Sequence, residues 1–98
     1  MNIVAVTACP TGIAHTYMAA EQLEKTGKAL GHRIKVETQG AMGIENEISA
    51  AEIAAADAVI FAVDIPVEQG ERFEGKRIIE VAVQLAIKDP KGIFARLG

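Results

Sequence analysis

The stretch that decides the fold is NIVAVTACPTGIAHT, residues 2–16 of the chain. Its first six residues are mostly apolar and β-branched, which is typical of a strand buried on both faces of a parallel sheet. Pro10 and Gly12 then interrupt regular structure and predict a loop over residues 8–14. From about residue 15 to residue 30 the apolar residues recur at helical spacing, with charged residues on the other face. The stretch therefore predicts a strand, a loop and a helix, in that order.

The rest of the chain continues this alternation of strands and helices. A capping box formed by Ser49 and Glu52 predicts the start of a short helix that ends at residue 56. The apolar run AVIFAV at 58–63 predicts a second buried strand, which Asp64 ends. The other expected elements are an exposed strand near the sheet edge at 33–38, a Gly-rich loop at 39–43, a short fourth strand at 72–74, a helix at 78–88 and a last helical turn that ends at 97.

This order of elements predicts a single α/β domain over residues 1–98. Strands separated by helices form a doubly wound, mostly parallel four-stranded sheet with helices on both faces. Right-handed crossovers place the first strand at the centre, between the second and the third. Ligands bind such sheets outside the carboxyl ends of the strands. The loops at 8–14 and 64–70 are therefore expected to share one crevice, which contains Cys9 and is bordered by Asp64.

The amino-acid composition argues against several classes of function. Of the 98 residues, half are apolar and 23% are charged, which is typical of a folded domain. The net charge of −3 argues against binding to nucleic acid, whose phosphates require a basic surface. No apolar stretch approaches the roughly 20 residues that span a bilayer, so direct membrane insertion is not expected. The single cysteine excludes an internal disulfide and is typical of a cytoplasmic protein.

Cys9 lies at the end of a predicted buried strand, just before the start of a helix. Unpaired backbone N–H groups and the positive end of the helix dipole favour the thiolate there, which is the nucleophilic form of cysteine. The same N–H groups form a cradle for a tetrahedral dianion. The pattern predicts a cysteine that carries a phosphoryl group. The expected phosphate-binding loop consists of Pro10, Thr11, Gly12, Ile13, Ala14, His15 and Thr16.

Most of these residues also have an ordinary structural interpretation. Cysteine is commonly a small, inert, buried hydrophobic residue. His15 fits a solvated residue in the first turn of the helix as well as a donor to a phosphoryl group. Thr11 and Thr16 fit residues that close the turn or cap the helix. Asp64 fits a cap for the turn that follows it as well as a residue of the crevice.

Other cysteine chemistries fit the spacing less well. A redox pair needs a second cysteine and a zinc site needs four ligands, so neither a metal nor a cofactor is expected. The glycine motifs of nucleotide-binding loops are absent from the sequence. The low-molecular-weight tyrosine phosphatases are a closer rival, because their signature is a cysteine, five residues, an arginine and a hydroxyl residue. Here His15 stands in the position of the arginine, and histidine cannot make the bidentate contact of arginine with phosphate.

On these residues, the chain resembles the IIB domain of the fructose family of the bacterial phosphoenolpyruvate-dependent sugar phosphotransferase system. The resemblance extends from residue 2 to about residue 94, and its most specific segment is VAVTACPTGIAHT at 4–16. The supporting segments are VETQG at 36–40, ADAVIFAVD at 56–64, RFEGK at 72–76 and AIKDP at 86–90.

The resemblance implies a phosphoryl carrier and transferase. Cys9 would accept phosphate from the phosphohistidine of a IIA protein or domain and become a phosphocysteine. It would then pass the phosphate to fructose, or to a fructose-like sugar bound in the membrane component IIC, in a step coupled to sugar uptake. IIC would bring the cytoplasmic protein to the inner face of the membrane. Two other functions stay open on the residues alone, a cysteine phosphatase and a non-catalytic phosphate-sensing module.

Overall fold

The structure is a computed structural model that describes residues 1–10, 13–40 and 43–97. In chain order its elements are β1 (Asn2–Ala8), α1 (Ile13–Ala29), β2 (Arg33–Gly40), β3 (Gly43–Glu45), α2 (Ala50–Ala55), β4 (Ala58–Val63), the 3₁₀ helix η1 (Gly70–Phe73), β5 (Ile78–Val81), α3 (Val83–Lys88) and α4 (Pro90–Ala95).

The five strands form one sheet in the order β3-β2-β1-β4-β5. β1 pairs in parallel with β2 and with β4, and β4 pairs in parallel with β5. The prediction that the first strand is central is therefore confirmed, and so is the α/β class. The prediction of a buried strand at 58–63 is also confirmed, because every residue of β4 is buried. α2 begins with the expected capping box, in which the Ser49 side chain accepts from the Glu52 backbone.

The structure has one strand more than the predicted four. β3 turns back on β2 and pairs with it antiparallel, with Gly43 opposite Gly40. It has three residues and lies in a Gly-rich segment, so it carries no periodic pattern from which it could be predicted. Because β3 forms this edge of the sheet, β2 is an interior strand and its residues 36–39 are buried. The prediction of a strand at 33–38 near the sheet edge is confirmed, but residues 36–38 are buried rather than exposed.

The predictions for residues 72–82 are also wrong. The expected fourth strand at 72–74 is a 3₁₀ turn, η1, and the residue after it. The expected helix at 78–88 begins only at Val83, because Ile78–Val81 is the edge strand β5. The apolar residues of this segment are spaced three and four apart, which favours a helix locally. Backbone pairing with β4 overrides that preference, since β5 completes the hydrogen bonds of an otherwise open edge.

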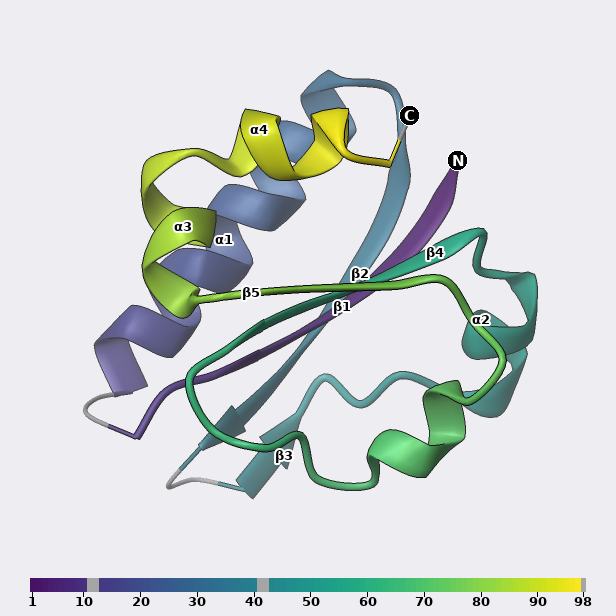
Figure 1. Cartoon of the computed structure of the whole chain (residues 1–98), viewed down its shortest axis with the longest axis horizontal. Helices are drawn as coiled ribbons and strands as arrows, with labels where there is room; N and C mark the ends of the chain where they lie inside the picture. The colour runs from purple at the N-terminus through teal and green to yellow at the C-terminus, as the bar shows by residue number, and fades with distance from the viewer. Residues whose placement is uncertain (11–12, 41–42, 98) are drawn as a thin grey trace.

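Helices cover both faces of the sheet, as predicted (Figure 1). On one face α1, α3 and α4 pack on the strands, and the core there includes Leu23 and Phe94 against Ile3. On the other face α2 and η1 pack on the same strands, with Ile53 and Phe73 in the core. The sheet is therefore buried on both sides, which is the usual arrangement for parallel strands.

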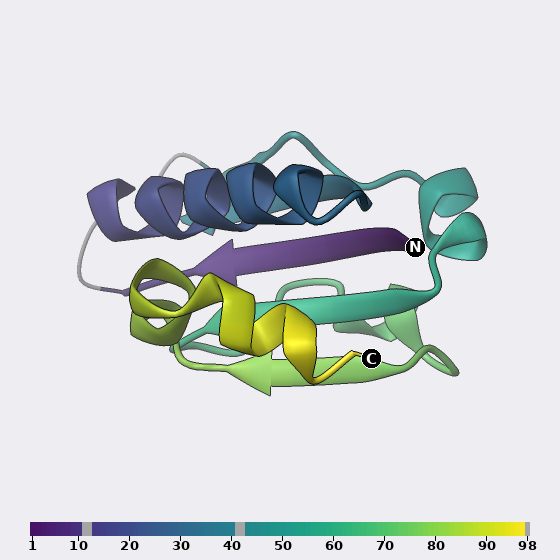
Figure 2. The ribbon, with the colours of Figure 1, turned by 90° about the horizontal axis from the view of Figure 1, so that it is seen from above.

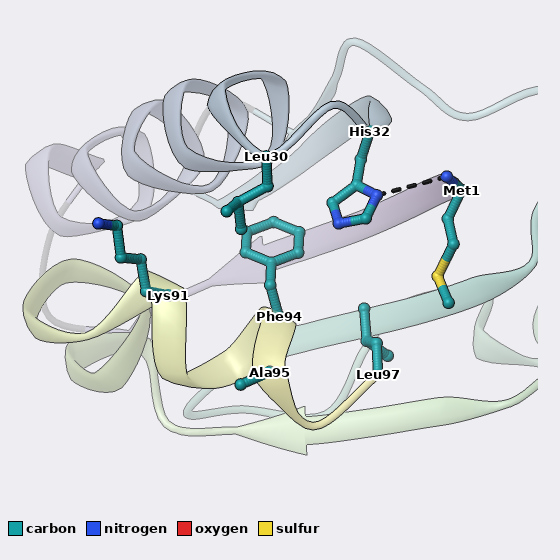
Figure 3. Close-up of a pocket in the computed structure, with 7 residues that line it drawn as sticks. All are labelled: Met1, Leu30, His32, Lys91, Phe94, Ala95 and Leu97. Atoms are coloured by element: carbon teal, nitrogen blue, oxygen red, sulfur yellow. Dashed lines mark hydrogen bonds between the residues drawn. The ribbon is translucent and has the colours of Figure 1, made fainter.

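The two ends of the chain lie at the end of the sheet opposite the carboxyl end of β1 (Figure 2). A cavity of about 450 Å³ opens there and is lined in part by Met1, His32 and Phe94 (Figure 3). The N-terminal ammonium donates to His32 Nδ1 at 3.3 Å. The His32 ring stacks on Phe94, with 5.6 Å between the ring centroids. No residue of the predicted site lines this cavity.

Candidate functional site

The carboxyl ends of β1 and β4 lie side by side. Ala8 is opposite Val63 in the parallel ladder, and the Asp64 backbone N–H donates to the Ala8 carbonyl at 3.0 Å. Parallel pairing in this register therefore brings the next residue of each strand, Cys9 and Asp64, to the same edge of the sheet.

Asp64 makes two contacts through its two carboxylate oxygens. Cys9 Sγ donates to Oδ2 at 3.8 Å, and the backbone N–H of Val83, the first residue of α3, donates to Oδ1 at 3.2 Å. Cys9 is 8% exposed and belongs to the core cluster under α1. Asp64 thus contacts the cysteine, and its second contact is with the first backbone N–H of α3 rather than with the turn that directly follows it.

The residues that follow Cys9 differ in their surroundings. Pro10 is an exposed turn residue, and Ala14 and His15 are exposed in the first turn of α1. Thr16 is 3% exposed. Its carbonyl accepts from Thr7 Oγ1 at 3.1 Å, but its own Oγ1 has no hydrogen-bond partner among the described residues. A buried hydroxyl without a partner is uncommon and leaves one donor available to a ligand.

Some of the predicted loop cannot be placed. Thr11 and Gly12 lie outside the described residues, and so does the side chain of Ile13, whose backbone begins α1. Among the described residues His15 makes no hydrogen bond or ion pair, so its ring is a solvated group near the N-terminal end of α1.

A neighbouring structural network was not predicted from the sequence. Gln39, at the carboxyl end of β2, donates through Nε2 to the Glu68 carbonyl at 3.0 Å and accepts from the Glu68 backbone N–H at 2.8 Å. This side-chain amide ties the loop after β4 to the sheet. Gln39 also donates to Glu37 Oε2 at 2.7 Å. The network therefore fixes the loop that begins at Asp64.

Glu37 is fully buried on β2 and forms an ion pair with Arg72. Arg72 Nη2 donates to Oε2 at 2.9 Å and Nη1 donates to Oε1 at 3.1 Å, while the Ile48 backbone N–H donates to Oε1 at 2.9 Å. Burial alone raises the pKa of Glu37, but the hydrogen bonds from Arg72, Ile48 and Gln39 outweigh it and hold the pKa below its usual value. The sequence signal for this network was present in the segments VETQG and RFEGK, which contain its charged residues.

A cavity of about 540 Å³ lies beside Asp64. Its lining includes Ile65 and Val67 from the loop after β4 and Glu80 from β5. Ile65 and Val67 are half-buried, and Glu80 is exposed. This cavity therefore offers both an apolar and an acidic surface next to Asp64, although Cys9 is not among its lining residues.

Two further features are absent from the described residues. They contain no group of three His, Cys, Asp or Glu side chains that could hold a metal ion. They also contain no helix with the length and apolar character needed to cross a membrane.

Comparisons with known proteins extend over almost the whole chain. A family model described as "PTS system, Lactose/Cellobiose specific IIB subunit" matches residues 4–96. The "PTS system fructose-like EIIB component 2" of Escherichia coli (strain K12) is 52% identical over 96 residues, which are 98% of this chain and 91% of the relative. The "PTS system fructose-specific EIIABC component" of Bacillus subtilis (strain 168) is 51% identical over 97% of this chain and 15% of that longer relative.

A solved structure indicates the same family. A domain of the fructose-specific IIABC component from Borrelia burgdorferi is 48% identical and superposes with a TM-score of 0.92, covering 97% of this chain and 90% of that one. Sequence and fold therefore agree, and the chain belongs to the IIB family of the sugar phosphotransferase system (PTS).

Proposed function

We propose that Cys9 is the residue through which this IIB family member transfers phosphoryl groups. It accepts a phosphoryl group from the phosphohistidine of a IIA protein or domain and holds it as a cysteine thiophosphate. It then donates the group to fructose, or to a fructose-like sugar bound in the membrane component IIC, as the sugar is taken up. The observation that carries this proposal is the position of Cys9 after the central strand and before the 17-residue helix α1.

The chemistry follows from that position. Cys9 Sγ attacks phosphorus in line, the S–P bond forms, the P–N bond to the donor imidazole breaks, and the thiol proton passes to that imidazole. Backbone N–H groups at the start of α1 stabilise the equatorial oxygens of the phosphoryl group. The buried hydroxyl of Thr16, which has no partner in the described part of the chain, supports this role because it lies in the first turn of the same helix. Pro10 through Thr16 form the phosphate-binding loop in this proposal, with Asp64 at its border.

The partners are proposed from the relatives and from the surface beside the site. The name of the Bacillus subtilis relative places A, B and C components in one chain, which supports IIA as donor and IIC as acceptor component for this protein. IIC then brings the protein to the inner face of the membrane. The apolar rim for docking consists of Ile13, Ile65 and Val67, of which Ile65 and Val67 line the cavity next to Asp64.

Fructose is the leading sugar, because both curated relatives described above carry fructose in their names. The description of the family model names lactose and cellobiose, so membership of the family alone does not determine the sugar. The sugar is held by IIC in this proposal, and its identity is measured there rather than on Cys9.

The test is the intact mass of the protein after incubation with phosphoenolpyruvate, the general phosphotransferase proteins and a fructose-type IIA. We expect one added phosphoryl group on the wild type and none on Cys9→Ser. Addition of membranes that contain the matching IIC and of fructose should remove the group and yield sugar phosphate. Cys9-dependent hydrolysis of an aryl phosphate without any adduct would instead identify a phosphatase. An adduct that survives in Cys9→Ser would place the phosphoryl group on another residue.

A further inference from the structure

We propose that Asp64 holds the Cys9 thiol through a hydrogen bond and destabilises the phosphorylated form of Cys9, so that the phosphoryl group is passed on rather than retained. The first half of this inference needs only the contact between the two side chains. The second half rests on the proposed function of Cys9.

The geometry fixes the carboxylate against the sulfur. Asp64 Oδ1 is engaged by the first backbone N–H of α3, at 3.2 Å from Val83 N, and this contact orients the side chain. The other oxygen, Oδ2, is then the acceptor for Cys9 Sγ at 3.8 Å. The Asp64 backbone is itself tied to Ala8, the residue before the cysteine. The carboxylate is therefore held from two elements while it faces the reactive atom.

Among the described residues, no basic side chain pairs with Asp64. In the described part of the chain the ion pairs are Lys35 with Glu52 and Arg72 with Glu37, and neither pair includes Asp64. The other titratable groups around this edge are Glu80 on β5, which lines the same cavity, and His15 in the first turn of α1, which is exposed. A carboxylate accepts a hydrogen bond from a thiol but repels an anionic group, so Asp64 interacts better with the Cys9 thiol than with phosphorylated Cys9.

The same repulsion acts on the phosphorylated cysteine. In the first transfer the S–P bond forms, the P–N bond breaks, and the proton that leaves the thiol is taken up by the departing imidazole. The product is a thiophosphate dianion next to a carboxylate of like charge. In the second transfer an O–P bond forms to the sugar, the S–P bond breaks, and the proton of the sugar hydroxyl returns to the sulfur. Asp64 favours that second product, because the restored thiol again donates to Oδ2.

The first experiment measures the rate of Cys9 alkylation by iodoacetamide as a function of pH in the unphosphorylated protein. Asp64→Asn keeps an oxygen for the Val83 N–H, and Asp64→Ser keeps a helix-capping hydroxyl, while both remove the charge. We expect Cys9 to be alkylated about three- to tenfold faster in both variants at neutral pH, because the sulfur no longer donates to a charged acceptor. Asp64→Glu keeps the charge and should stay near the wild-type profile.

Asp57→Asn is the matched control, because it makes the same change in net charge at the other end of β4. Asp57 Oδ2 accepts from the Asn2 backbone N–H at 2.8 Å, far from the cysteine edge of the sheet. Its alkylation profile should coincide with the wild type. If neither Asp64→Asn nor Asp64→Ser moves the profile relative to Asp57→Asn, the inference is wrong.

The second experiment measures the equilibrium between phosphorylated IIA and phosphorylated Cys9. Asp64→Asn should shift this equilibrium towards phospho-Cys9 by about three- to tenfold and slow the transfer to sugar. An unchanged equilibrium would overturn the second half of the inference. If wild-type Cys9 takes up no phosphate at all, the proposed function fails, whereas the alkylation profiles still decide whether Asp64 controls the thiol.

Discussion

At the scale of single residues, two threonine hydroxyls near Cys9 are expected to differ in purpose, because one stabilises the fold and the other is available to a ligand. Both side chains are buried, but Thr7 Oγ1 donates to a backbone carbonyl at 3.1 Å whereas Thr16 Oγ1 has no partner among the described residues. A buried hydroxyl that makes no hydrogen bond contributes nothing to the fold in return for its desolvation. In the proposed function, the group that this hydroxyl contacts is the phosphoryl group on Cys9.

We therefore expect opposite results from the same substitution at these two positions. Thr16→Val should leave the free energy of unfolding within about 0.5 kcal/mol of wild type, because no hydrogen bond is lost. It should slow the phosphorylation of Cys9 by about 10- to 100-fold, because a donor to the transferring group is removed. Thr7→Val should cost about 1 kcal/mol in urea denaturation. A wild-type phosphorylation rate in Thr16→Val would show that the hydroxyl does not contact the phosphoryl group.

At the scale of elements, the loop after β4 is held by a side chain from another strand. Gln39 of β2 makes two hydrogen bonds with the backbone of Glu68, at 3.0 and 2.8 Å. Loops are ordinarily the most mobile part of such a sheet. Here the two hydrogen bonds of the Gln39 side-chain amide limit that motion. Because the loop begins at Asp64, they also limit the motion of the carboxylate that contacts Cys9.

Gln39→Met should loosen this loop without unfolding the sheet. The Glu68 N–H and carbonyl lose their partner, which we expect to cost about 1–3 kcal/mol. Amide exchange of Glu68 should accelerate, and phosphoryl transfer should slow several-fold because Asp64 and the docking rim become less well positioned. Gln84→Met, at an exposed position of α3, is the control and should change neither. If amide exchange of Glu68 stays at the wild-type rate in Gln39→Met, Gln39 does not restrain this loop.

At the scale of the whole molecule, one buried ion pair connects three segments. Glu37 of β2 binds Arg72 of η1 and the backbone of Ile48, which precedes α2. Since the surrounding hydrogen bonds keep the pKa of Glu37 below its usual value of 4.5, ionised Glu37 stabilises the fold. That contribution is fully present above the unfolded value and is lost as the pH falls through the lower, folded value.

The pH dependence of stability should therefore depend on this one carboxylate. We expect the free energy of unfolding of the wild type to fall steeply below about pH 4.5. Glu37→Gln should be less stable by about 2–4 kcal/mol at pH 7, because Arg72 loses its partner, and its profile below pH 4.5 should be shallower. Glu21→Gln, on the exposed face of α1, serves as the control and should follow the wild type. Parallel profiles for Glu37→Gln and wild type would rule out this linkage.

The sequence by itself determined the α/β class, the central first strand, the helix after Cys9 and the family. These depend on signals within short segments: a run of apolar residues for β1 and for β4, a capping box for α2, and the segment VAVTACPTGIAHT. Residues that are neighbours in the chain generate such signals, so they can be interpreted without knowledge of the fold.

Only the tertiary structure decided the strands β3 and β5, the network around Glu37 and the two contacts of Asp64. β5 is a strand because β4 offers an open edge, although its own apolar spacing favours a helix. Glu37 and Arg72 are 35 residues apart in the chain, and Cys9 and Asp64 are 55 apart. Contacts at such separations depend on strand order and register, which no local pattern encodes, and they are what place a carboxylate against the reactive sulfur.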